Sequence, residues 1–334
     1  MGRRGYAHGM PEPLWDLAGF VLKAIVVTIT FIICVGFVFS RARARRSAEP
    51  LVRLREVSER WRRNTAAIRA GLAATGKKLA RRSKELKPPR PEELPKARVF
   101  VLDFKGDVLA TQTESLREEV TVVLGVAEQG DEVVVRLESS GGAVHGYGLA
   151  ASQLARLRAK GIPLTICVDK VAASGGYMMA CVGQRVLAAP FAVIGSIGVV
   201  APVPNLHRLL EKHGVDYEDM TAGRYKRTVT LLGRITDEGR TKFKEQLEDT
   251  HELFKRFVGE MRPALDVEAV ATGEHWYGRR AIELGLVDGL ATSDDYLLER
   301  ASAARVFEVL CERPRSVRER AASMARAALD WLSP

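Results

Sequence analysis

A serine followed by two glycines is the feature of this sequence best suited to chemistry. Ser174 stands in the run VDKVAASGGY, residues 168–177, where an apolar stretch gives way to a predicted helix. Small neighbours let a substrate backbone approach the hydroxyl, and the N–H of Gly175 can face an oxyanion at the positive end of the helix. This pattern is typical of the nucleophile of an acyl transfer. The same residues also fit a plain helix start with Ser174 as its N-cap, so both interpretations stay open.

A second glycine run lies one strand–helix unit earlier. Residues 137–144 read LESSGGAV, between a predicted strand and a predicted helix. Gly141 and Gly142 can turn backbone N–H groups towards a ligand, as a pocket for a developing oxyanion requires. Together with Ser174, the run predicts an oxyanion site made from two adjacent strand–helix junctions. A glycine-rich turn without chemistry is the alternative.

A serine hydroxyl needs a base before it can attack. None of the six histidines lies in a recognisable triad pattern, and His145, beside the second glycine run, is the candidate among them. Lys226, in TAGRYKRT at residues 221–228, is the other candidate. A lysine acts as a base only where burial lowers its pKa, and the small residues around it allow burial. Taken alone, the residues favour a solvated surface lysine.

The elements that would position these residues alternate along the chain. Strands are predicted over residues 99–104, 132–137, 164–168, 185–188 and 197–200, and helices over 116–128, 146–160, 174–181, 204–213, 237–261 and 278–284. Strands that alternate with helices predict an α/β domain with largely parallel strands. We expect this domain to begin near residue 96, after a proline-rich linker.

The N-terminal region predicts a membrane anchor. After a tail at residues 1–16, residues 17–39 are apolar with Lys23 as the only charge, which is long enough to span a bilayer. A cleaved signal peptide is the rival interpretation, but the arginines that follow at once are a poor cleavage context. Residues 40–95 then form a basic segment and linker, with helical spacing over 49–86. That helix could lie on the membrane, pair in a coiled coil or be solvated.

Charge is concentrated in one segment. The chain carries a net charge of +10, whereas residues 41–98 alone carry 19 lysines and arginines against six acidic residues, a net +13. A basic segment directly after an apolar span favours anionic lipid over nucleic acid, for which no motif is present. The positive-inside rule then places the bulk of the chain in the cytoplasm.

The four cysteines give no sign of a metal site or a disulfide framework. Cys34, Cys167, Cys181 and Cys311 show no CxxC spacing, and there is no HExxH pattern. We therefore predict no metal and no cofactor.

Three long stretches resemble the SohB-type membrane proteases of the signal peptide peptidase A (SppA) family. They are VDKVAASGGYMMACVGQRVLAAPFAVIGSIGVV at residues 168–200, TAGRYKRTVTLLG at 221–233 and VATGEHWYGRRAIELGLVD at 270–288. The similarity extends over about residues 96–300, and the anchor and basic segment are similar in layout to that family's N-terminal region. Residues 301–334 then predict a C-terminal strand and an amphipathic helix.

The resemblance implies a ClpP/crotonase-like fold over residues 96–300 and a Ser–Lys dyad. By motif, Ser174 corresponds to the nucleophile and Lys226 to the general base, with oxyanion N–H groups from Gly175, Gly141 and Gly142. Ser196, in the GSIG motif, corresponds to a position that can hydrogen-bond the lysine, and a structural turn serine is its alternative. The two dyad residues can come from neighbouring subunits in such peptidases, which implies a homo-oligomer.

The function that follows is a membrane-anchored serine endopeptidase of the bacterial inner membrane, with a single pass and no cofactor. Its expected substrates are signal-peptide remnants and unfolded or membrane-proximal segments, and lipid is its other expected partner. Better-known relatives of this family act on the outer face of the membrane, whereas the charge rule favours the cytoplasmic face, so the side stays open. A crotonase-type acyl-CoA enzyme and a non-proteolytic membrane scaffold are the alternatives.

Overall fold

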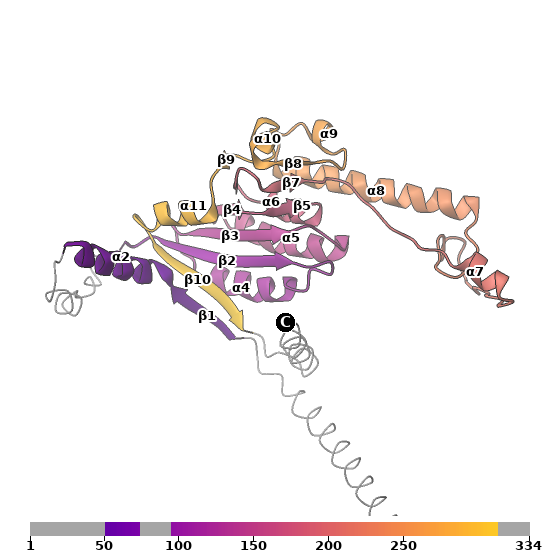
Figure 1. Ribbon diagram of the computed structural model, residues 1–334, viewed down its shortest axis with the longest axis horizontal. Coiled ribbons are helices and arrows are strands. Elements are labelled where there is room, and N and C mark those ends of the chain that lie inside the picture. The colour runs from indigo at the N-terminus through magenta and orange to yellow at the C-terminus, as the bar shows by residue number, and fades with distance from the viewer. Residues whose placement is uncertain (1–50, 74–94, 313–334) are drawn as a thin grey trace, which may run out of the picture. The chain divides into compact units, whose positions relative to one another are not determined.

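The computed structural model describes residues 51–73 and 95–312, and its compact unit comprises Val52–Glu312 (Figure 1). Within these described residues, no helix is both long and apolar enough to cross a bilayer. The predicted anchor at residues 17–39 and the C-terminal amphipathic helix lie outside them, as does most of the proline-rich linker.

A largely parallel sheet forms the centre of the unit. Its main path runs in the order β1-β10-β2-β3-β4-β6-β9. The strands are β1 (Leu51–Glu56), β2 (Arg98–Gly106), β3 (Glu132–Ser139), β4 (Leu164–Val168), β6 (Arg185–Ala188), β9 (Gly289–Leu290) and β10 (Arg305–Glu312). From β10 to β9 every neighbouring pair is parallel. Parallel neighbours need crossover connections, here mostly helices, so the predicted α/β fold is confirmed.

The sheet branches at the carboxyl end of β3. There β5 (Val171–Ala173) pairs with β3 through Ser139 and Ala172, and also pairs with β7 (Val193–Gly195). The strand β7 in turn pairs antiparallel with β8 (His275–Tyr277). This branch brings the end of β3 beside the residues that follow β5, which include Ser174.

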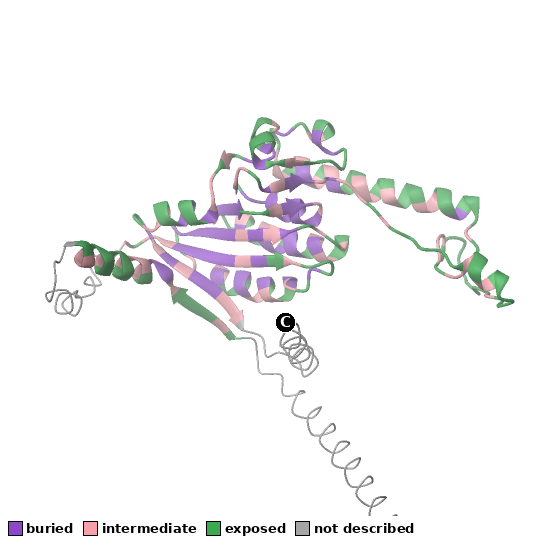
Figure 2. Cartoon of the chain, viewed as in Figure 1, coloured by how far each residue is buried: buried purple, intermediate pink, exposed green. Residues whose placement is uncertain are grey.

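Helices cover both faces of the sheet. On one face, Phe100, Leu102 and Phe104 of β2 belong to the larger core, which also contains buried residues of α4 (Thr113–Val126), α5 (Val144–Ala159) and α6 (Gly175–Ala180). On the other face, Val99 and Val101 form a second core with α2 (Val57–Ala73) and α11 (Ser293–Arg300). The central strands are therefore buried on both faces (Figure 2), which is why they read as continuous apolar runs.

One region of the unit contributes little to either core. It is residues 201–236, which we call the arm, and it contains α7 (His207–Lys212). Within the arm only Gly233 is buried. The arm lies along the N-terminal part of α8 (Asp237–Met261), and Figure 1 shows α7 near that end of the helix. Two short helices, α9 (Val267–Val270) and α10 (Gly278–Glu283), follow α8 along the chain.

The structure corrects the helix expected over residues 49–86. Residues 51–56 form strand β1, and the helix α2 begins only at Val57. Two ion pairs hold the strand beside β10: Arg55 contacts Glu308, and Arg305 contacts Glu56. Leucine and valine spaced along LVRLRE fit a helix as well as a strand, and these distant charged partners decide between them.

The strand expected at residues 197–200 is also wrong, because β7 ends at Gly195. The three short strands β5, β8 and β9 were not expected from the sequence.

Candidate active site

Ser174 occupies a strained position between β5 and α6. Its backbone φ is 51° and its ψ is −119°, a region that residues with a side chain seldom adopt. Its N–H donates to the carbonyl of Gly195 at 2.8 Å, and its carbonyl accepts from the N–H of Met178 at 3.0 Å. The side chain makes no capping hydrogen bond although Ser174 is the N-cap residue. The plain N-cap interpretation therefore does not hold, and the hydroxyl is left facing a groove.

The loop at Gly141 and Gly142 packs directly against Ser174. A Cβ atom on Gly141, whose φ is +89°, would lie 2.8 Å from the Cβ of Ser174 and 2.8 Å from the nitrogen of Gly175. A Cβ atom on Gly142 would lie 2.2 Å from the carbonyl oxygen of Val108. Both positions therefore need glycine, because backbone from neighbouring segments fills the space of a side chain. The expected meeting of two strand–helix junctions is present.

The N–H groups at this meeting point are not equivalent. The N–H of Gly141 donates to Ser139 Oγ at 3.0 Å. Among the described residues, the N–H groups of Gly142 and Gly175 donate no hydrogen bond. Gly175 is the first residue of α6, where an N–H has no partner within the helix. Gly142 and Gly175 therefore each keep an N–H group free for a ligand beside Ser174, whereas the N–H of Gly141 is engaged.

Ser174 lines an open groove of about 1180 Å³. Apolar side chains supply much of its wall, including Val144, Val199, Phe243 and Leu247. Ser174 also lines a recess of only about 10 Å³ beside Met178 and Phe254. A groove with this lining can hold an extended chain with small or apolar side chains.

Ser196 lies in the same groove. Its φ is 53°, and its N–H donates to the carbonyl of Glu274 at 2.6 Å. The preceding residue, Gly195, accepts the hydrogen bond from the N–H of Ser174. Ser196 thus belongs to the turn that holds the serine junction, and its side chain is half-buried beside it.

Lys226 is not brought to this groove by the fold of a single chain. It lies in the arm, is exposed, and is not among the residues that line the groove. Its own N–H donates to the carbonyl of Gly223 at 3.1 Å. The neighbouring Tyr225 ring lies 5.5 Å from Nζ of Lys242 on α8, which locates this part of the arm beside the first turns of that helix. The chain therefore brings together the residues expected at the site, with the exception of Lys226.

Two histidines line the groove. His145, at the start of α5, is exposed. His251 of α8 was not singled out from the sequence, and its Nε2 lies 3.2 Å from the carbonyl oxygen of Ile197. A carbonyl can only accept, so Nε2 carries the proton and fastens α8 to the wall of the groove. No sequence signal could have found this contact, because it joins residues more than fifty positions apart.

The cysteines offer no rival nucleophile in the core. Burial raises the pKa of the Cys167 and Cys181 thiols to about 12. Thiols with such pKa values stay protonated at neutral pH and do not attack. Within residues 51–73 and 95–312, no group of three or more His, Cys, Asp or Glu side chains could hold a metal ion.

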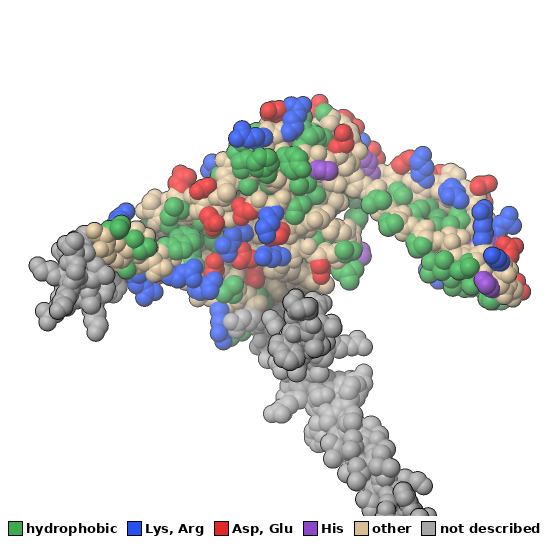
Figure 3. Space-filling view, in the orientation of Figure 1, with side chains coloured by type: hydrophobic (Ala, Val, Ile, Leu, Met, Phe, Trp, Pro, Cys, Tyr) green, Lys and Arg blue, Asp and Glu red, His purple; other side chains and the backbone are tan. Residues whose placement is uncertain are grey.

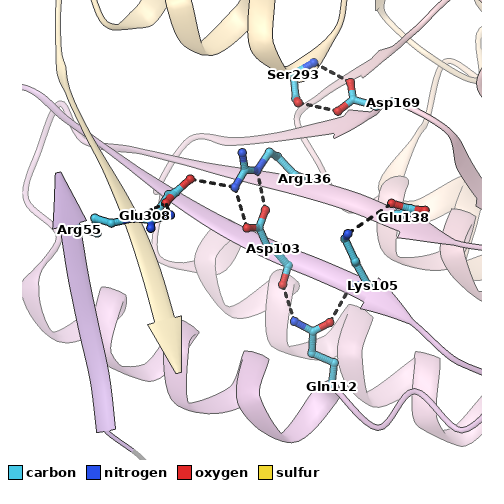
Figure 4. Close-up of polar contacts among 9 residues, drawn as sticks. All are labelled: Arg55, Asp103, Lys105, Gln112, Arg136, Glu138, Asp169, Ser293 and Glu308. Atoms are coloured by element: carbon cyan, nitrogen blue, oxygen red, sulfur yellow. Dashed lines mark hydrogen bonds and ion pairs between the residues drawn. The ribbon is translucent and has the colours of Figure 1, made fainter. Parts of the chain in front are cut away.

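A second hollow, of about 360 Å³, lies on the face of the sheet that carries the smaller core. Most of its charged groups pair with one another: Arg136 contacts Asp103 at 2.5 Å and Glu308 at 3.0 Å (Figure 4), and Lys170 contacts Glu138 at 3.1 Å. Ser293 donates to Asp169 and so joins α11 to the end of β4. This network links β3 to its neighbours β2 and β10 through side chains.

An α/β fold with a serine set in a strained turn between a strand and a helix, above an apolar groove, is typical of hydrolases that act through a serine. Comparison with known proteins defines the class more closely. The profile of peptidase family S49 matches residues 156–306, and the profile of the family's N-terminal region matches residues 12–154.

Curated relatives agree with the profiles. "Probable protease SohB" of Haemophilus influenzae is 47% identical over 305 residues, which cover 87% of this chain and 86% of that protein. "Probable protease SohB" of Buchnera aphidicola subsp. Acyrthosiphon pisum is 58% identical over 205 residues, which cover 61% of each. The chain therefore belongs to peptidase family S49 and is a serine peptidase.

Among solved structures, a mutant of the membrane-bound stomatin-specific protease 1510-N in complex with a substrate peptide is similar with a TM-score of 0.43 and 13% sequence identity. The match covers 70% of this chain and 99% of that one. The family assignment favours the peptidase over the acyl-CoA enzyme among the alternatives that the sequence left open.

Proposed function

We propose that this chain is a membrane-anchored serine endopeptidase whose nucleophile is Ser174. The observation that carries the proposal is the Ser174 hydroxyl, which lies in a strained turn and makes no capping bond. The open groove beside it, of about 1180 Å³, has room for a peptide. We also propose a ClpP/crotonase-like fold, which the branching of the parallel sheet at β3 supports.

The chemistry follows the dyad implied by the sequence. Ser174 Oγ attacks the peptide carbonyl carbon while Lys226 Nζ takes the hydroxyl proton. The carbonyl oxygen becomes an oxyanion that accepts hydrogen bonds from the N–H groups of Gly142 and Gly175. The C–N bond then breaks, and Lys226 returns the proton to the leaving amine. Water, deprotonated by the same lysine, hydrolyses the acyl-enzyme.

In this proposal Lys226 acts on a serine of a neighbouring copy of the chain. The support is the contrast between an exposed lysine and a groove that it does not line. The arm also exposes large apolar side chains, since Met220 is 90% exposed and Leu209 is 51% exposed, and Val200 beside it is 86% exposed. A second copy that packs on the arm would cover them and exclude water from the lysine. Ser196 is then placed to hydrogen-bond the incoming amine.

The proposed substrates are extended peptides with small or apolar residues near the scissile bond. The apolar wall of the groove and the narrow recess beside Ser174 support this preference. Signal-peptide remnants and unfolded segments near the membrane have such sequences. The apolar stretch at residues 17–39 would hold the enzyme in the inner membrane of a bacterium.

The test uses the full-length protein in detergent and a fluorescently labelled unfolded substrate such as casein. Wild type should cleave it, whereas Ser174→Ala and Lys226→Ala should each be inactive. Co-expression of the two inactive variants should restore part of the activity, because some subunit pairs then join an intact serine to an intact lysine.

Wild type co-expressed with the double variant S174A/K226A is the matched control for dilution of active subunits. Absence of any recovery in the mixed variants would place both dyad residues in one chain. A wild type that is inert towards every substrate would overturn the proposed activity and favour a scaffold.

A further inference from the structure

A chain of hydrogen bonds runs beneath the glycine loop, the loop that contains Gly141 and Gly142. The N–H of Gly141 donates to Ser139 Oγ at 3.0 Å. Ser139 Oγ lies 2.6 Å from Tyr147 Oη, and Tyr147 Oη donates to the carbonyl of Asp107 at 2.8 Å. The last acceptor is a carbonyl, so the proton of Tyr147 is committed to it and Ser139 must donate to Tyr147. Each hydroxyl therefore donates once and accepts once, in a single direction.

Because the hydroxyl groups are buried, breaking this chain of hydrogen bonds costs free energy. Ser139 is 2% exposed and Tyr147 is fully buried, so neither hydroxyl can exchange its partner for bulk water. Burial and the nearby charge of Asp107 raise the pKa of Tyr147, although the hydrogen bond from Ser139 opposes the rise. The phenol therefore keeps the proton that it donates.

The space around Tyr147 is shaped by glycines. A Cβ atom on Gly106 would lie 2.2 Å from Tyr147 Oη and 2.5 Å from Ser139 Oγ. A Cβ atom on Gly175 would lie 2.4 Å from Cγ of the Tyr147 ring. The ring thus supports Gly175 from below while the hydroxyl holds the loop that carries Gly142.

The turn that contains Asp107, at the other end of the chain of hydrogen bonds, contacts the same glycine loop. The carbonyl of Val108, next to Asp107, accepts the N–H of Ala143 at 2.7 Å and lies against Gly142. Hydrogen bonds from Thr111 lower the pKa of Asp107 and hold this turn in place. Tyr147 therefore contacts the turn, the residue that anchors the glycine loop, and the serine junction.

We propose that Ser139 and Tyr147 are positioning residues for the oxyanion site. They act through Gly141, whose N–H anchors the loop and does not bind the oxyanion. In this way they fix the orientation of the N–H groups of Gly142 and Gly175. Donors that are oriented before the reaction stabilise the transition state without reorganising. The inference rests on the proposed function for its catalytic consequence and on the contacts alone for its structural one.

The kinetic test compares variants that remove one hydroxyl each. Tyr147→Phe keeps the ring beneath Gly175, and Ser139→Ala removes the acceptor of the Gly141 N–H. Each should lower kcat by about 10- to 100-fold with KM within about twofold, because misplaced donors affect the transition state more than substrate binding. The kcat of the double variant should be little lower than that of either single variant, since both substitutions interrupt the same chain of hydrogen bonds.

Tyr177→Phe is the matched control. Tyr177 is as fully buried as Tyr147, and its hydroxyl also donates to a carbonyl, that of Leu286 at 2.9 Å. Its kcat should stay within about twofold of wild type. An unchanged kcat in Tyr147→Phe, independent losses in the double variant, or an equal loss in Tyr177→Phe would each overturn the proposal.

A second measurement does not depend on activity. Hydrogen exchange followed by mass spectrometry on the full-length protein should show faster exchange in peptides covering residues 139–146 in Tyr147→Phe and Ser139→Ala, but not in Tyr177→Phe. If wild type proves inactive, this measurement still tests whether the hydrogen bonds of Ser139 and Tyr147 hold the glycine loop in place. Unchanged exchange in both variants would refute the positioning role even in an active enzyme.

Discussion

The serine junction and the arm are built in opposite ways. Among residues 171–182, all but Val171 and Ser174 are buried, whereas in the arm only Gly233 is (Figure 2). The junction holds Ser174 at a positive φ, and packed backbone on several sides keeps it there. Basic and hydrophobic side chains share the surface of the arm and of the adjoining part of α8, at the right of Figure 3.

This difference separates the two halves of the proposed chemistry. The nucleophile and the oxyanion donors are oriented by the folding of one chain, so they exist before any substrate or partner arrives. The proposed base lies where the chain supplies little packing, so its environment must come from outside. Activity that depends on assembly would follow directly, because an isolated chain would hold a finished nucleophile without its base.

The largest effect is expected at the junction itself. Ser174→Ala should lower kcat by at least about 10⁴-fold, because the bond-forming atom is lost. The midpoint of thermal unfolding should not fall, since alanine keeps the packing and the hydroxyl makes no capping bond. Ser152→Ala, which removes an exposed hydroxyl bonded to Gly148 on α5, is the control and should keep full activity. Substantial cleavage by Ser174→Ala would move the nucleophile elsewhere.

A loss of activity nearly as large is expected from a substitution in the arm, with no change in stability. Lys226→Ala should lower kcat by about 10³-fold, as expected for removal of a general base, while the exposed site leaves the unfolding midpoint unchanged. Lys226→Arg should not restore activity, because a guanidinium does not deprotonate. Retention of activity in Lys226→Ala would shift attention to His145, which lines the groove.

A pair of glycines tests the contrast in packing. Gly141 and Gly223 have similar φ values, +89° and +100°, but only Gly141 has backbone atoms within 3 Å of the place that a Cβ atom would take. Alanine costs about 1–2 kcal/mol at either site through its backbone conformation. Gly141→Ala should lose a further 1–3 kcal/mol or so of unfolding free energy through overpacking. Urea unfolding followed by tryptophan fluorescence measures both, and equal losses would contradict the contrast.

The smallest effect is expected far from both regions, at the amino ends of β2 and β3. Asp131 is 3% exposed and accepts hydrogen bonds from the guanidinium and backbone N–H of Arg98 and from the N–H of Glu128. Burial acts to raise the pKa of Asp131, but the bonds from Arg98 and the backbone outweigh it and lower the pKa. Asp131→Asn should therefore cost about 1–3 kcal/mol of stability at neutral pH, with kcat unchanged.

The pH dependence of that loss has a fixed sign. A carboxylate with a lowered pKa stabilises the fold fully above its unfolded pKa of about 3.9, and this contribution disappears as the pH falls through the folded pKa. The gap between wild type and Asp131→Asn should be constant above about pH 5 and shrink below about pH 4. Glu128→Gln, at an 80% exposed side chain 3.6 Å from the same Arg98, should show almost no loss at any pH.

Much of the fold could be predicted because its central strands are buried on both faces. The runs at β4 and β6 are short and apolar, and their bounds match the prediction to the residue. The strand β1 was missed because the leucines and valine of LVRLRE fit a helix as well as a strand, and its partners Glu308 and Arg305 lie some 250 positions away. The strand β5 has only three residues, too few for a periodic pattern.

The site divides in the same way. Glycines next to a serine at strand ends carry a local signal, so Ser174, Gly175, Gly141 and Gly142 could be found from the residues. The catalytic roles of these four residues stay predictions, as do those of Lys226 and Ser196, which came from the resemblance. Tyr147 reads as an ordinary aromatic residue of a helix, and only the fold shows its hydroxyl beneath the loop.

The two buried thiols have a practical consequence for labelling. Cys167 and Cys181 lie in the core with pKa values of about 12, so they stay protonated and out of reach of soluble alkylating reagents. A thiol introduced on the arm by Lys226→Cys would face solvent and react far sooner. Alkylation with 2-bromoethylamine would then rebuild an amine of almost the same length as lysine, with sulfur in place of one methylene. The proposed base is thus open to chemical replacement in the folded protein, with a single methylene exchanged for sulfur.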